Sequence, residues 1–190
     1  SASSIGSTAN FILVKNVVDA LQAIAIYHRE QFSLPVIGIT GSNGKTIVKE
    51  WLSQLLDVEY DIIKSPKSYK SQVGVPLSIW AINSNHNLGL FEAGISKPNE
   101  MERLEKIIQP SIGLITNIGP PHAENFENKQ HKTREKLRLF NKVSTLIFCC
   151  DYKEIMAEIG VLYIHNPKLI FQWSRENSDA NLYITEEHAA

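Results

Sequence analysis

Cysteine is scarce in this chain of 190 residues, and the two that occur, Cys149 and Cys150, are adjacent. Neighbours on an extended strand point to opposite faces, so no disulfide is expected between them. The lack of a disulfide framework predicts a reducing, cytoplasmic setting. No apolar run approaches the roughly 20 residues that a membrane-spanning helix needs. The first residues also lack the charged start and apolar stretch of a secretion signal.

The chain also has almost no net charge, because its 19 basic and 20 acidic residues nearly balance and are mixed along the sequence. Neither a nucleic-acid surface nor a polybasic membrane contact is therefore expected. The chain does have 43% apolar and 21% charged residues, the balance of a globular domain with a substantial core. Residues 1–9 are expected to be a flexible lead-in.

Apolar segments with strand character alternate with segments of helical periodicity. Strands are predicted at 34–40, 60–65, 88–94, 112–118, 145–150, 161–164 and 169–173, and helices at 16–32, 47–56, 75–82, 99–108, 129–143 and 153–159. Residues 177–190 read as a loop and one more strand. This alternation predicts an α/β fold, with a mostly parallel sheet and helices on both faces.

The segment Thr40-Gly-Ser-Asn-Gly-Lys-Thr46 lies between a predicted strand and a predicted helix. In that place glycines let main-chain N–H groups turn toward one point, and the helix dipole adds positive potential. Lys45 is expected to reach the β- and γ-phosphates of a nucleotide, and the Thr46 hydroxyl to bind Mg²⁺. Only two residues separate Gly41 from Gly44, so this is a shortened variant of the general phosphate-loop pattern. A chance glycine turn before a lysine is the alternative, and the strand-to-helix context argues against it.

Three more candidate ligands follow the carboxyl ends of predicted strands, where open α/β sheets bind ligands. Glu92 ends one strand, His122 follows a glycine–proline turn after the next strand, and Lys136 lies on the helix beyond. Each also has an ordinary structural interpretation: a solvated strand end, a loop residue and a helix-surface lysine. Histidine is an uncommon ligand for Mg²⁺, which prefers oxygen. These residues by themselves indicate an ATP- and Mg²⁺-binding α/β protein and no particular reaction.

Four segments occur together in a recognisable order and spacing: Thr40–Thr46, Phe91-Glu-Ala-Gly94, Thr116-Asn-Ile-Gly-Pro-Pro-His122 and Arg134-Glu-Lys136. Over about residues 12–175 they resemble the central domain of the Mur ligases, the ATP-dependent amide-forming enzymes of peptidoglycan synthesis. Val48-Lys-Glu50, Val73-Gly-Val-Pro-Leu77 and the spacing of 14 from His122 to Lys136 are most similar to one branch. That branch adds D-alanyl-D-alanine to a UDP-muramoyl tripeptide. The segment Ser65-Pro-Lys-Ser-Tyr69 resembles members of the branch that are fused to an alanine racemase.

The resemblance implies roles for individual residues. Thr46 and Glu92 would hold a first Mg²⁺, and His122 and Lys136 would contribute to a second. Lys136 would do so after carbamylation, which turns a cation into a carboxylate-like anion. Lys45, His122 and Lys136 would be the catalytic residues. The residues implied in ATP binding are Gly41, Ser42, Asn43, Gly44, Lys45, Thr46 and Asn117.

The resemblance also implies a reaction and partners. ATP would phosphorylate the terminal carboxylate of the UDP-muramoyl peptide, and the amine of the incoming dipeptide would attack the resulting acyl phosphate. Residues 10–34 would be a linker helix from the end of an N-terminal domain, and 35–190 an ATP-binding central domain shortened at its C-terminal end. The N- and C-terminal Mur domains would then be missing partners, and the chain alone is expected to be inactive.

Two positions depart from the pattern of that branch. Lys70 stands where asparagine is usual before Ser71, in a stretch expected to line the substrate side. Cys149-Cys150-Asp151 replaces a usual asparagine near aspartate, a candidate adenine contact, and both cysteines are expected to be buried strand residues. Three alternatives stay open: another ligase of the superfamily such as a folylpolyglutamate synthase, a nucleotide-binding module without chemistry, and a small-molecule kinase in which Lys136 has no role.

Overall fold

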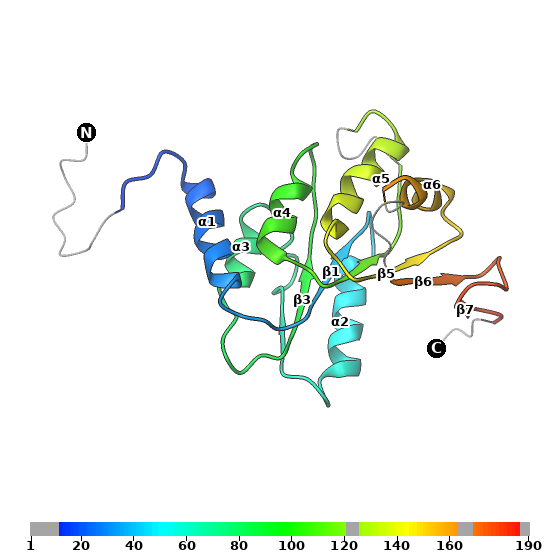
Figure 1. Ribbon diagram of the computed structural model, residues 1–190, viewed down its shortest axis with the longest axis horizontal. Coiled ribbons are helices and arrows are strands. Elements are labelled where there is room, and N and C mark those ends of the chain that lie inside the picture. The colour runs from blue at the N-terminus through cyan, green and yellow to red at the C-terminus, as the bar shows by residue number, and fades with distance from the viewer. Residues whose placement is uncertain (1–11, 121–125, 163–168, 187–190) are drawn as a thin grey trace.

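The computed structural model describes residues 12–120, 126–162 and 169–186. Within these ranges seven strands form one central sheet, in the spatial order β2-β3-β1-β4-β5-β6-β7 (Figure 1). Each pair of neighbouring strands is parallel. The strands are β1 Val36–Thr40, β2 Ile62–Lys64, β3 Leu88–Glu92, β4 Ile112–Ile115, β5 Thr145–Cys149, β6 Leu169–Ser174 and β7 Leu182–Tyr183. The predicted α/β fold with a parallel sheet is confirmed.

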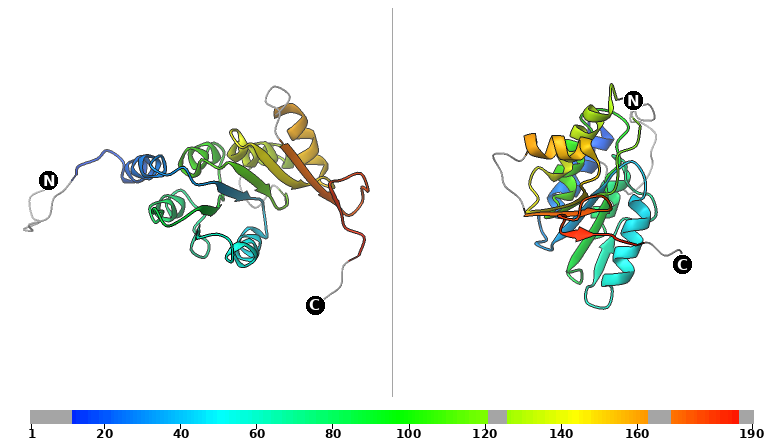
Figure 2. Two further views of the ribbon diagram at one scale, coloured as in Figure 1. Left: turned by 60° about the horizontal axis from the view of Figure 1, so that its bottom comes forward. Right: turned by 90° about the vertical axis from the view of Figure 1, so that its right-hand side faces the viewer.

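Helices connect the strands and cover both faces of the sheet. They are α1 Val17–Arg29, α2 Lys45–Leu56, α3 Gly74–Ile79, α4 Met101–Ile108, α5 Lys129–Leu137, α6 Lys153–Leu162 and the 3₁₀ turn η2 Arg138–Phe140. Helix α2 lies on one face, where Leu52 and Leu56 pack against β1 and β3. Helices α4 and α6 lie on the opposite face (Figure 2), over a larger core that contains Leu104 and Ile155. Because both faces are covered, β1 is buried along its whole length.

Strand β1 marks the point where the sheet changes its direction of growth. Strands β3 and β2 extend the sheet on one side of β1, and β4 to β7 extend it on the other. Open parallel sheets bind ligands at such a point, outside the carboxyl ends of the strands. In the register, Ile39 of β1 is paired with Glu92 of β3, and Thr40 is paired with Ile115 of β4. The loops that follow β1, β3 and β4 therefore meet at one edge of the sheet.

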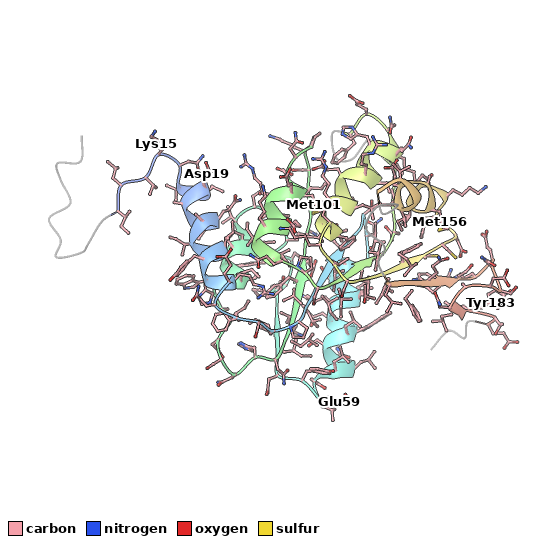
Figure 3. The ribbon with its side chains drawn as sticks, in the orientation of Figure 1. Lys15, Asp19, Glu59, Met101, Met156 and Tyr183 are labelled. Carbon is pink, nitrogen blue, oxygen red and sulfur yellow. The ribbon has the colours of Figure 1, made fainter. Side chains whose placement is uncertain are left out.

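Helix α1 packs against α3 and α4 at the side of the domain. Its first turn is capped by Asn16, whose side chain accepts from the N–H groups of Val18 and Asp19. Asp19, labelled in Figure 3, pairs with Arg103 of α4 at 3.6 Å. At the other end of the helix the buried Arg29 donates to the carbonyl oxygen of Ile108 at 3.0 Å. That this helix continues from another domain stays a prediction.

Two predicted elements are wrong in extent or type. The helix expected over 129–143 ends at Leu137, and η2 follows it. This tighter turn brings Phe140 into the core, where its ring leaves no room for a Cβ atom at Gly113. The strand expected over 161–164 is also wrong, because residues 161 and 162 continue α6. A short apolar run cannot be assigned to strand or helix by periodicity alone, and here its first residue, Val161, is exposed at the end of the helix. Residues 163 and 164, like the lead-in at 1–9, lie outside the described residues.

None of the helices in the described ranges has the length and hydropathy that crossing a membrane requires.

Candidate nucleotide-binding site

The loop at residues 41–44 turns from the end of β1 into the start of α2. Gly41 and Gly44 have φ angles of 140° and 80°, in a region that residues with side chains rarely adopt. A Cβ atom at Gly41 would also lie 2.0 Å from Oγ1 of Thr116. Gly44 is the N-cap of α2, and the first turn of this helix has no acidic residue. The helix start therefore keeps its positive potential for an anion.

The loop after β4 holds the phosphate loop in shape. Asn117 accepts from the N–H of Ser42 through its main-chain oxygen at 2.9 Å and from the N–H of Asn43 through Oδ1 at 3.0 Å. The Thr116 hydroxyl donates to the carbonyl oxygen of Asn43 at 2.6 Å. Ser42 Oγ in turn accepts from the N–H of Gly119 at 2.8 Å. Asn117 thus stabilises the loop through these two hydrogen bonds, and its expected contact with the nucleotide stays a prediction.

Lys45 is the first residue of α2, and only 6% of it is exposed. Its ammonium group folds back on the loop and donates to the carbonyl oxygens of Gly41 at 2.6 Å and Ser42 at 3.1 Å. A cleft of about 250 Å³, called here the phosphate cleft, opens beside it. The phosphate cleft is lined by Ser42, Asn43, Gly44, Lys45, Thr46, Ile47 and Lys70. A helix start and a sequestered cation suit this cleft to a chain of phosphates.

Thr46 and Glu92 meet beside this loop. Glu92 is fully buried at the end of β3, and its Oε2 accepts from the Thr46 hydroxyl at 3.0 Å. Its Oε1 lies 3.1 Å from Nζ of Lys49, which is also fully buried. Lys49 donates further to the carbonyl oxygens of Ser65 at 2.5 Å and Lys67 at 2.9 Å. A buried carboxylate needs such partners because burial removes its hydration. Oε2 of Glu92 thus accepts a hydrogen bond, whereas Oε1 has an ion-pair partner and no hydrogen bond within the described residues.

Lys136 is fully buried on α5, so its ordinary interpretation as a helix-surface lysine is wrong. It lines a second cleft of about 450 Å³, called here the acceptor cleft. The lining of the acceptor cleft is Ser42, Lys45, Lys70, Ser71, Gln72, Val73, Gly94, Ile95, Ser96, Glu100 and Lys136. The structure thus brings Lys136 and Lys45 to one cleft. His122 lies outside the described residues.

The oxygens of Thr46 and Glu92 fit a magnesium ion that arrives with a nucleotide. Mg²⁺ usually takes one or two protein oxygens and completes its shell with phosphate oxygens and water. Thr46, which lines the phosphate cleft, and the buried Glu92 supply two such oxygens, 3.0 Å apart. In the part of the chain that the structure describes, no group of three or more His, Cys, Asp or Glu side chains gathers as a metal site. The donor set suits a shared site better than a cage built by the protein alone.

The turn after β6 is tied to the end of β5 by Asp151. Its carboxylate accepts from the N–H of Arg175 at 2.9 Å and from the hydroxyl of Ser174. These two hydrogen bonds, the one from Arg175 first, lower the pKa of Asp151. Cys149 is buried beside it, and burial raises the pKa of its thiol to about 11. Cys150 is only half-buried, so the expected burial holds fully for Cys149 alone. An adenine contact in this region stays a prediction.

Sequence reasoning missed Lys49. Lysine is among the residues that are seldom fully buried, so a buried lysine on a helix is not what composition leads one to expect. The available signal was its spacing, because residues three apart in a helix share a face and Lys49 follows Thr46 by three. A side chain on that face points to the same strand end as Thr46. The buried carboxylate of Glu92 at that strand end requires a cation or a donor.

These features define a class of protein: a parallel α/β nucleotide-binding domain whose shortened phosphate loop lies at the switch point of its sheet. Residues 39–187 match the family model of the Mur ligase middle domain. The match spans most of the chain, and the chain belongs to the Mur ligase family through this domain.

Two curated relatives share one name. The chain is 37% identical over 156 residues to the UDP-N-acetylmuramoyl-tripeptide–D-alanyl-D-alanine ligase of Borreliella burgdorferi, covering 79% of this chain and 34% of that protein. It is 32% identical over 130 residues to the ligase of the same name from Bacillus subtilis, covering 68% of this chain and 28% of that one. The chain therefore spans about a third of the length of these curated relatives.

Solved structures agree in fold. The crystal structure of MurF from Acinetobacter baumannii superposes with a TM-score of 0.81 at 24% identity, over 96% of this chain and 40% of that one. The MurF ligase of Thermotoga maritima in complex with ADP superposes with a TM-score of 0.79 at 25% identity, over 92% of this chain and 40% of that one.

Proposed function

We propose that this chain is the ATP-binding domain of a cytoplasmic ligase that joins UDP-N-acetylmuramoyl-tripeptide to D-alanyl-D-alanine. The relatives named for this reaction support the substrates. One observation carries the nucleotide site: the Thr46 hydroxyl lies 3.0 Å from the buried carboxylate of Glu92, directly after the phosphate loop. In this proposal the N- and C-terminal Mur domains are required partners, because they complete the sites of the other two substrates.

In the proposed reaction the residues of this chain bind and orient ATP. Lys45 and the start of α2 hold the phosphates, so Lys45 exchanges its carbonyl partners for phosphate oxygens. Thr46 and Glu92 would hold Mg²⁺, which would offset the negative charge of the transferring phosphoryl group. Lys136 faces the acceptor cleft from α5. If carbamylated, it joins His122 at a second Mg²⁺ site.

The substrate undergoes two steps. A carboxylate oxygen of the tripeptide attacks the terminal phosphorus of ATP, and ADP leaves. The neutral amine of D-alanyl-D-alanine then attacks the acyl carbon, a new C–N bond forms, and phosphate leaves with the bonding electrons of the acyl C–O bond. The nitrogen gives up one proton to the solvent. Holding the reacting groups in line is the main contribution of the protein.

Titration calorimetry with ADP and ATP, with and without Mg²⁺, tests the nucleotide site. Thr46→Val removes the hydroxyl at constant shape and is expected to weaken Mg²⁺-nucleotide binding about 10-fold, as the loss of one charge-assisted bond. Without Mg²⁺, the affinity of the Thr46→Val variant for the nucleotide should be nearly unchanged. Thr185→Val, at an exposed position, is the matched control. Failure of the unmodified chain to bind millimolar nucleotide would contradict the site.

The reaction is tested on the chain joined to N- and C-terminal Mur domains. Phosphate release should then require both the UDP-linked tripeptide and D-alanyl-D-alanine, and equal release with either alone would contradict the proposed ligase.

A further inference from the structure

Lys70 lies where the two clefts join. Three residues line both the phosphate cleft and the acceptor cleft, namely Ser42, Lys45 and Lys70. Ser42 and Lys45 belong to the phosphate loop itself, whereas Lys70 comes from the segment between β2 and α3. A phosphate chain held by the loop, and passed to an acceptor in the second cleft, presents its terminal phosphate at this junction. Lys70 therefore faces the place where that phosphate must stand.

The position of Lys70 is fixed by Gly94, which follows β3 by two residues. The carbonyl oxygen of Lys70 accepts from the N–H of Gly94 at 2.8 Å. Its side-chain stem lies over Gly94, where an added Cβ atom would come within 2.9 Å of Cγ of Lys70. On the far side of the segment the Gln72 side chain donates to the carbonyl oxygen of Glu100 at 3.1 Å. The lysine stem is thus held in place, and Gly94 is needed to make room for it.

The charge of Lys70 is available to a ligand. No hydrogen bond or ion pair joins its ammonium group to another residue of the described ranges. Lys49, by contrast, is committed to the carboxylate of Glu92. The carboxylate of Glu100, which also lines the acceptor cleft, is taken by the N–H groups of Ser96 at 2.8 Å and Lys97 at 3.0 Å. A half-buried cation at a cleft junction attracts an anion more strongly than an exposed one, because water screens it less.

We propose that Lys70 binds the terminal phosphate of a nucleoside triphosphate, and so makes the site favour triphosphate over diphosphate. This inference rests on the proposed nucleotide site. The asparagine that is usual at this position could offer only a neutral hydrogen bond, whereas an ammonium group makes a charge-assisted one of about twice the strength. The selectivity expected from Lys70 is therefore a property of this chain and not of the general phosphate loop.

The test compares the dissociation constants of Mg²⁺-ADP and of a non-hydrolysable Mg²⁺-ATP analogue for the chain and its variants. Lys70→Met removes the charge and keeps an unbranched stem over Gly94, so the fold is expected to persist. It should weaken binding of the ATP analogue about 10-fold and of ADP less than 2-fold. Lys70→Gln is a second neutral variant, should the first fail to fold. Lys97→Met, at an exposed position that lines neither cleft, is the matched control.

The outcomes distinguish the role of Lys70 from the existence of the nucleotide site. Lys45→Met should weaken both nucleotides, because that residue belongs to the phosphate loop. Equal losses of both nucleotides in the Lys70 variants, or no loss, would overturn the role of Lys70 and leave the nucleotide site standing. Absence of any binding to the unmodified chain would overturn the nucleotide site, and the role of Lys70 with it.

Discussion

Replacing Lys49 with methionine is expected to destabilise the domain by about 3–5 kcal/mol, the cost of leaving one member of a buried ion pair alone. Neither Lys49 nor Glu92 exposes its side chain, and their charged atoms lie 3.1 Å apart. Methionine fills a similar volume, so the loss of stability comes from the missing ion pair and hydrogen bonds rather than from a cavity. The carbonyl oxygens of Ser65 and Lys67 lose a donor at the same time. For a chain of this size the midpoint of thermal unfolding should fall by on the order of 10 °C.

Urea denaturation followed by circular dichroism measures the effect. Lys64→Met is the control, because Lys64 pairs at 2.6 Å with Glu50 and both side chains are more than a third exposed, although Glu50 also lies 3.1 Å from Lys49. Exposed pairs contribute only about 0–1 kcal/mol, so that variant should unfold almost as the unmodified chain does. The double variant Lys49→Met with Glu92→Gln should be less destabilised than Lys49→Met alone, since no lone charge stays buried. Equal unfolding free energies for Lys49→Met and Lys64→Met would refute the reasoning.

Three further predictions concern the loop, a thiol and an ion pair. Gly41→Ala should abolish measurable nucleotide binding in calorimetry, because its Cβ would meet Thr116 at 2.0 Å and φ is 140°; retained affinity would contradict this. Cys149, with a pKa of about 11, should resist iodoacetamide at pH 8 until the chain unfolds, which peptide mass spectrometry checks. The bidentate bonds from Arg134 at 2.8 and 3.0 Å lower the pKa of Glu158 below 4.5. Their stabilisation is present above the ordinary pKa of a glutamate and lost as the pH falls through the lowered pKa, so the melting points of Arg134→Met and the unmodified chain should differ at pH 7 and converge in acid, below that lowered pKa.

Local patterns predicted the elements that depend on nearby residues. The phosphate loop was evident from two glycines, a lysine and a threonine between an apolar run and a helical period. The helix before β1 and the one after Gly44 were evident for the same reason, because periodicity follows from which face is buried. The end of α5 was wrong, since the turn at Arg138–Phe140 is set by what Phe140 packs against. Contacts of that kind join residues far apart in the chain.

The sequence by itself determined the class of fold and the place of the phosphate loop, because both follow from short-range periodicity and from the conformational freedom of glycine. Short-range patterns could not show which side chains share the site: the family resemblance paired Thr46 with Glu92, and the tertiary structure gives the contact between them. Parallel pairing places the end of β3 beside the end of β1 and so brings Glu92 to Thr46. The same arrangement gives Lys49 its ion pair with Glu92 and places Lys70 in the lining of a cleft. Burial and ion pairing depend on strands and loops that meet only in three dimensions.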